Sequence, residues 1–69
     1  MTHTYFLSTD AETASNIRVS IPLIEADNGS AWLISWADGF ASLQARIRSL
    51  LPRGHARVVV AEITDYVAI

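Results

Sequence analysis

The sequence contains no cysteine and no lysine, and it has no long hydrophobic run. Without cysteine the chain can form neither a disulfide nor a thiolate metal site, which favours an intracellular, cytoplasmic setting. A transmembrane helix needs about 18 or more consecutive apolar residues, and no such run exists, so no membrane partner is expected. The first residues, MTHTYFLSTD, lack a basic region followed by an apolar segment, and no signal peptide is expected.

Motifs that carry the common chemistries are also missing. The two histidines, His3 and His55, are far apart, and no closely spaced set of metal ligands includes them. There is no GxSxG nucleophile elbow, and the glycines are isolated, so no glycine-rich loop can cradle a phosphate. Most acids fall in predicted turns and helix caps, where backbone hydrogen bonding explains them. We therefore expect no enzymatic activity, no catalytic residue, no cofactor and no metal.

Hydrophobic residues are abundant instead, at 51% of a 69-residue chain. This length allows a single domain, residues 1–69, and a domain of this size buries only about 60% of its unfolded surface. Such an apolar chain predicts either a large core or an apolar surface that a partner covers.

The strongest periodic pattern runs from Asp38 to Leu51 and predicts the main helix. Its apolar residues recur at the spacing of one helix face: Phe40, Leu43, Ile47, Leu50 and Leu51. Asp38 is a suitable N-cap, and Pro52 ends the helix because the residue before a proline avoids the helical region.

Four segments predict strands, at residues 4–8, 16–26, 31–36 and 57–63. In the second, alternation places Ile17, Val19, Ile21 and Leu23 on one face. Asn28-Gly29 favours a type I′ turn, which pairs Glu25 with Trp32 across a hairpin. This register turns Trp32 and Trp36 toward the helix, and Trp32, near the turn, is expected to be the more exposed of the two.

The expected fold class is therefore α+β, a four-stranded antiparallel sheet with one main helix (about 38–51) packed on one face. The element order resembles a truncated ferredoxin-like βαββαβ domain, which places the first strand centrally and the second at an edge. The apolar run Tyr5–Leu7 suits the centre and Pro22 suits an edge. The connection between the first two strands, with Thr9 and Glu12 as a capping box, is short for that crossover. The alternative is a βββαβ meander with one helix.

Charge is distributed unevenly, since residues 1–38 carry a net −4 and residues 39–69 a net +2, for a total of −2. In size, acidity and lack of cysteine the chain resembles small inhibitor proteins of phages and mobile elements, of the anti-CRISPR type. The resemblance implies a small non-enzymatic protein that acts in the host cell cytoplasm. Such a protein blocks a protein or nucleoprotein complex by covering its surface or by mimicking nucleic-acid charge.

The expected partner-binding residues are acids of the N-terminal half together with small residues on the outer side of the main helix. They are Asp10, Glu12, Glu25, Asp27, Ala41 and Ala45. A nucleic-acid-binding domain is the alternative, and its contacts would be Arg46, Arg48, Arg53 and Arg57. The net negative charge disfavours it. A homodimer or larger homo-oligomer, joined through the strand edge at residues 58–60 or through residues 66–69, is the third hypothesis.

Overall fold

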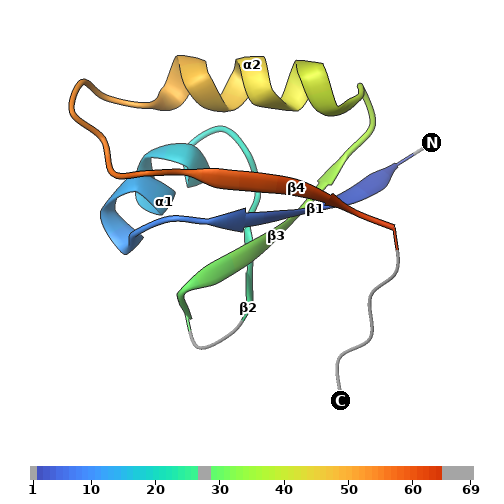
Figure 1. The fold of residues 1–69 in the computed structure, drawn as a ribbon, viewed down its shortest axis with the longest axis horizontal. Helices are drawn as coiled ribbons and strands as arrows, with labels where there is room; N and C mark the ends of the chain where they lie inside the picture. Colours follow the sequence, from blue (N-terminus) through green and yellow to red (C-terminus); the bar gives the residue numbers. More distant parts are fainter. Residues whose placement is uncertain (1, 27–28, 65–69) are drawn as a thin grey trace.

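The computed structural model describes residues 2–26 and 29–64, and it contains one four-stranded antiparallel sheet and two helices (Figure 1). In chain order the elements are β1 (His3–Ser8), α1 (Ala11–Arg18), β2 (Ile24–Ala26), β3 (Ala31–Trp36), α2 (Phe40–Leu50) and β4 (Val59–Ile63). The strand order is β2-β3-β1-β4, and every neighbouring pair is antiparallel. The predicted α+β class and four-stranded antiparallel sheet are confirmed. The meander alternative is wrong, because β1 pairs with β3 and β4 and not with β2.

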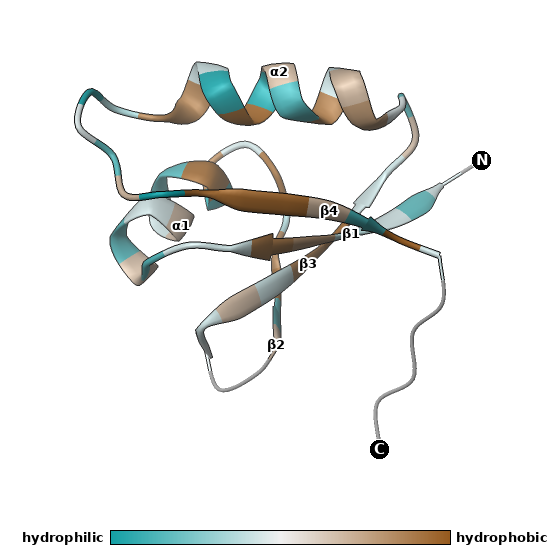
Figure 2. Ribbon diagram, in the orientation of Figure 1, coloured by the Kyte–Doolittle hydropathy of each residue, from teal (hydrophilic) through white to brown (hydrophobic). Residues whose placement is uncertain are grey.

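The hydrophobic core lies between the two helices and one face of the sheet. Its largest fully buried side chains are Tyr5, Leu7, Ile17, Ile21, Ile34 and Leu43. Buried residues of α1 and of α2 belong to the same cluster as those of β1 and β3. Both helices therefore pack on one face of the sheet, and the amphipathic pattern of α2 is visible as alternating colours along the helix in Figure 2.

α1 reaches Arg18, and the strand expected over residues 16–26 is wrong for its first half. Ile17 is a buried residue of α1 and Ile21 is buried just after it, while Val19 between them is 85% exposed. The alternating pattern misled because Ile17 and Ile21 are also four apart, which is helical spacing. With α1 extended to Arg18, residues 9–23 are long enough to connect β1 to the far edge of the sheet.

The helix caps also differ from the prediction. Asp10, not Thr9, caps α1, and its side chain accepts a hydrogen bond of 2.7 Å from the backbone N–H of Thr13. α2 begins after Gly39, whose φ of +91° is a conformation that side chains disfavour, and Asp38 makes no cap. The predicted end of α2 before Pro52 is confirmed.

The β2–β3 hairpin has the predicted register, with Glu25 opposite Trp32. Gly29 has the positive φ that the expected turn requires, at +81°. Trp32 is only 3% exposed, so the expectation that it would be the more exposed tryptophan is wrong, and Trp36 is the half-buried one. The reason is position: Trp32 lies opposite Leu7 of β1, over the middle of the core.

Leu43→Ala tests whether α2 holds the core together. Leu43 is fully buried, and removing a buried leucine side chain costs about 2–5 kcal/mol of unfolding free energy. We expect the urea midpoint of unfolding to fall sharply, because the total free energy of unfolding of a native domain is only about 5–15 kcal/mol. Ala45→Gln, on the exposed side of the same helix, is the control and should change the free energy by less than about 0.5 kcal/mol. Equal losses in both variants would contradict the packing described.

Candidate functional site

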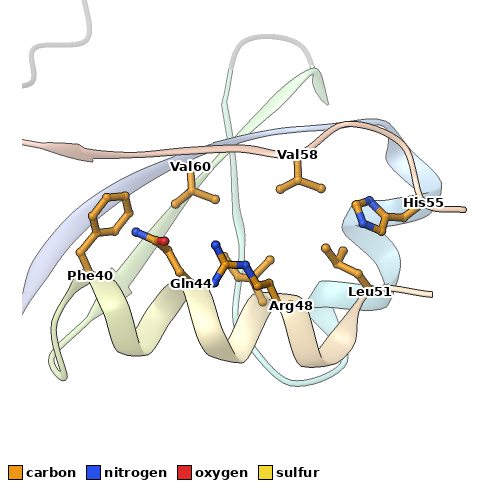
Figure 3. Close-up of a pocket in the computed structure, with 8 residues that line it drawn as sticks. Phe40, Gln44, Arg48, Leu51, His55, Val58 and Val60 are labelled. Atoms are coloured by element: carbon orange, nitrogen blue, oxygen red, sulfur yellow. The ribbon is translucent and has the colours of Figure 1, made fainter. Parts of the chain in front are cut away.

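A cleft of about 600 Å³ lies between α2 and β4, on the helix side of the sheet (Figure 3). One wall is the flank of α2 and the other is formed by β4 and the segment before it. The lining residues are Phe40, Gln44, Ile47, Arg48, Leu51, His55, Val58 and Val60. This volume lies within the range of about 300–1,000 Å³ that is usual for ligand pockets.

The apolar part of the cleft follows from the periodicity of its two walls. Side chains four apart on α2 share one flank, so Phe40, Gln44 and Arg48 line the same wall. On the opposite wall Val58 and Val60 point to one side of the strand, toward α2 (Figure 3). One end is closed by Phe40, whose ring stacks on the buried ring of Tyr5 at a centroid distance of 5.4 Å. Burial raises the pKa of the Tyr5 phenol, and the Glu62 carboxylate raises it further.

The polar groups of the cleft are an arginine, a histidine and an amide, and none of its lining residues is a carboxylate. In His55 the ring Nδ1 lies 2.6 Å from the carbonyl oxygen of Ala56. Since a carbonyl can only accept, Nδ1 carries the proton and donates that bond. Arg48 extends from α2 toward the valines of the other wall (Figure 3). The cleft therefore combines an apolar floor with net positive charge.

Within residues 2–26 and 29–64, no helix covers the opposite face of the sheet, because both helices pack on the other side. Strand pairing aligns one row of side chains across all four strands, in the order Ile24, Leu33, Phe6 and Ala61. The flanking rows on this face are Ala26, Ala31, Ser8 and Val59 on one side, and Ser35, Thr4 and Ile63 on the other. None of these residues is charged. Ile24 is 61% exposed and Val59 is 42% exposed.

The predicted acidic patch is divided in the structure. Asp10 and Glu12, at the start of α1, line a small depression of about 240 Å³ together with Arg53 and His55. Glu25 lies exposed on the edge strand β2, on a different element. Asp27 lies outside the described residues. The acids that can be placed therefore do not form one uniformly negative surface, because a loop arginine shares the depression with two of them.

The remaining predicted residues are exposed but scattered. Ala41 and Ala45 lie on the exposed side of α2, as expected. Arg46, Arg53 and Arg57 are exposed and do not line the cleft, so only Arg48 among the four arginines belongs to it. A contact between His3 and Glu62, whose Nδ1 and Oε2 atoms lie 3.2 Å apart, was not predicted from the sequence. The cleft was not predicted either, although the β-branched residues Val58 and Val60 indicated one of its walls.

Comparison with protein-family models, with curated proteins and with solved structures found no match to this chain. Within residues 2–26 and 29–64, no three His, Asp or Glu side chains gather closely enough to hold a metal ion. Neither helix in this part of the chain is long and apolar enough to span a membrane. Each candidate site is therefore inferred from the geometry of the structure alone.

Asp10 gives a testable dependence of stability on pH. Its hydrogen bonds with Thr13 hold the pKa of its carboxyl below the ordinary value of 3.8. A carboxyl whose pKa is lower in the folded than in the unfolded state stabilises the fold fully above its ordinary pKa of 3.8. This contribution disappears as the pH falls through the folded-state pKa. Asp10→Asn keeps a capping side chain but removes the charge. We expect the melting temperature of the native protein to exceed that of Asp10→Asn at neutral pH, with the difference vanishing in acid.

Glu25→Gln is the control for loss of one negative charge away from the helix terminus. Thermal unfolding followed by circular dichroism between pH 2 and pH 7 measures all three proteins. A difference between the native protein and Asp10→Asn that stays constant with pH would show that the Asp10 carboxylate does not stabilise α1.

Proposed function

We propose that this protein is a non-enzymatic binding protein that attaches to a protein partner through the open face of its sheet. The observation that carries the proposal is the uncharged surface formed by the row from Ile24 to Ala61 and its flanking rows. It runs across all four strands, and its most exposed large hydrophobic side chain is Ile24.

The physical argument is the free energy of hydration. Each Å² of apolar surface removed from water contributes about 25 cal/mol, and soluble proteins rarely leave a wide contiguous apolar patch uncovered. Both helices are committed to the other face, so no described helix can cover this one. An uncharged sheet face is best matched by a complementary, weakly charged surface of a partner.

Among the two modes of inhibition that the sequence suggested, the geometry favours surface occlusion over charge mimicry. Asp10 is used as a helix cap, and Arg53 shares the depression of Asp10 and Glu12. Mimicry of a nucleic acid requires a row of unpaired negative charges, whereas occlusion requires only area and fit. The proposal therefore names the uncharged sheet face, not the acids, as the contact surface.

We further propose that binding inhibits the partner, in the manner of the anti-CRISPR proteins that the chain resembles in size and charge. A rigid domain seated on a surface prevents any other molecule from using it. We also propose that the domain is a truncated ferredoxin-like one. The predicted element order and the central position of β1 support this assignment.

Ile24→Lys tests the contact surface directly. Ile24 lies on the edge strand β2, at one end of the central row of this face, and a lysine buried there against an apolar partner leaves an unpaired charge, which costs several kcal/mol. Val19→Lys is the matched control, because Val19 is an exposed hydrophobic residue that lies beyond α1 and off the sheet. We expect immobilised native protein and Val19→Lys to retain the same partner from a lysate of the source cell. Ile24→Lys should retain at least about tenfold less.

Unchanged melting temperatures establish that both variants are folded. Light scattering of the native protein tests whether the partner is a second copy of this chain. A stable homodimer that Ile24→Lys disrupts would show that a second copy occupies the face. That result, or equal retention by Ile24→Lys and Val19→Lys, would overturn the proposal.

A further inference from the structure

The two edges of the sheet are unlike each other. The edge strand β2 has only three residues, it follows Pro22 closely, and it carries an acid, Glu25. Short strands, prolines and charges are the features by which proteins prevent another strand from pairing at an edge. β4, at the other edge, has five residues and no proline, begins with two β-branched residues and also carries one acid, Glu62. Its first part is hydrophobic, as the brown colour in Figure 2 shows, so length and proline distinguish the two edges. The structure therefore protects one edge and leaves the other able to pair.

The cleft lies directly along this second edge. β4 pairs with β1 on one side, and no other described strand pairs with it. Across the cleft from β4, the flank of α2 provides Gln44 and Arg48, and Val60 of β4 faces them (Figure 3). A strand added beside β4 would form backbone hydrogen bonds with it, and every second side chain of that strand would point toward α2.

We propose that an extended peptide segment of a partner protein, carrying an acidic side chain, adds to β4 as a further strand. Its apolar side chains occupy the cleft against Phe40, Val58 and Val60, and its carboxylate pairs with the Arg48 guanidinium. Charge complementarity selects the acid, because the cleft lining contains the Arg48 guanidinium and no carboxylate. Arginine suits this role since its planar group can bind both oxygens of a carboxylate.

This site goes beyond the proposed function, because the cleft lies on the helix side of the sheet and the proposed contact surface lies on the other. Ile24→Lys removes the contact surface and leaves the cleft lining unchanged. A peptide that binds native protein and Ile24→Lys equally therefore tests the cleft alone, and each proposal can fail without the other.

The probe is a set of acetylated peptide amides of the pattern apolar-Thr-apolar-Thr-X, with Val, Ile, Leu or Phe at the apolar positions. X is Glu, Gln or Lys. Binding is followed by NMR of the isotope-labelled full chain, which reports both affinity and the protection of β4 amides. We expect the Glu peptides to bind about fivefold more tightly than the Gln peptides, the upper range for a partly exposed ion pair. Lys peptides should bind least.

Arg48→Glu and Arg46→Glu form a matched pair of charge reversals on α2, because both arginines are exposed and only Arg48 lines the cleft. Arg48→Glu should reverse the preference, so that Lys peptides bind best, and Arg46→Glu should keep the preference for Glu. Methylation of the peptide nitrogens that face β4 should weaken binding about tenfold, because it removes backbone hydrogen bonds.

Three kinds of result would overturn the proposal. The first concerns affinity and charge: either no peptide of the set binds with a Kd below about 1 mM, or Arg48→Glu leaves the preference for Glu unchanged. The second is that N-methylated peptides bind as well as the others, which would show a small-anion site without strand addition. The third is that β4 amides are protected before any peptide is added, which would show that the edge is already occupied by the protein's own chain or by a second copy.

Discussion

The packing of both helices on one face of the sheet is the constraint from which the rest of the structure follows. Leu43 and Ile47 of α2 meet Tyr5, Leu7 and Ile34 in a single buried cluster. A sheet has two faces, and since both described helices pack on one of them, no described helix covers the other. The uncharged outer face is therefore a direct consequence of where the core lies. On the inner face, the helices also leave space, because α2 alone stands over the edge strand β4.

Much of this fold could be predicted from residue patterns where a pattern has one meaning. The strand at residues 31–36 and the helix before Pro52 occur as predicted, because a turn signal precedes the strand, apolar residues mark one face of the helix and a proline follows it. The hairpin register was predictable because Asn28-Gly29 fixes the loop length, and Glu25 does pair with Trp32. The central place of β1 followed from three consecutive apolar residues, which need cover on both faces.

The wrong predictions arose where one residue pattern fits both a strand and a helix, or where two neighbouring residues can serve as the same cap. Ile17 and Ile21 satisfy both a strand and a helix, and only the exposure of Val19 distinguishes them. Thr9 and Asp10 are both capable N-caps, and the choice depends on where the chain leaves β1. The residues of one wall of the cleft, Val58 and Val60, lie in a predicted strand, but the cleft itself could not be predicted. Its volume depends on how far α2 stands from β4, and no spacing in the sequence specifies that separation.

β4 is the element that both surfaces share, and this decides how their roles can be separated. Alternate residues of an extended strand point to opposite faces, so Val60 faces the cleft while Val59 and Ala61 belong to the open face. Any change in the backbone of β4 would disturb both surfaces together, and a substitution of its valines could not be assigned to one of them. Ile24 and Arg48 lie on other elements, β2 and α2, and each belongs to a single surface. A charge placed at either position consequently reports on that surface alone. The uncharged face and the positively charged cleft can therefore be tested separately, although they share a strand.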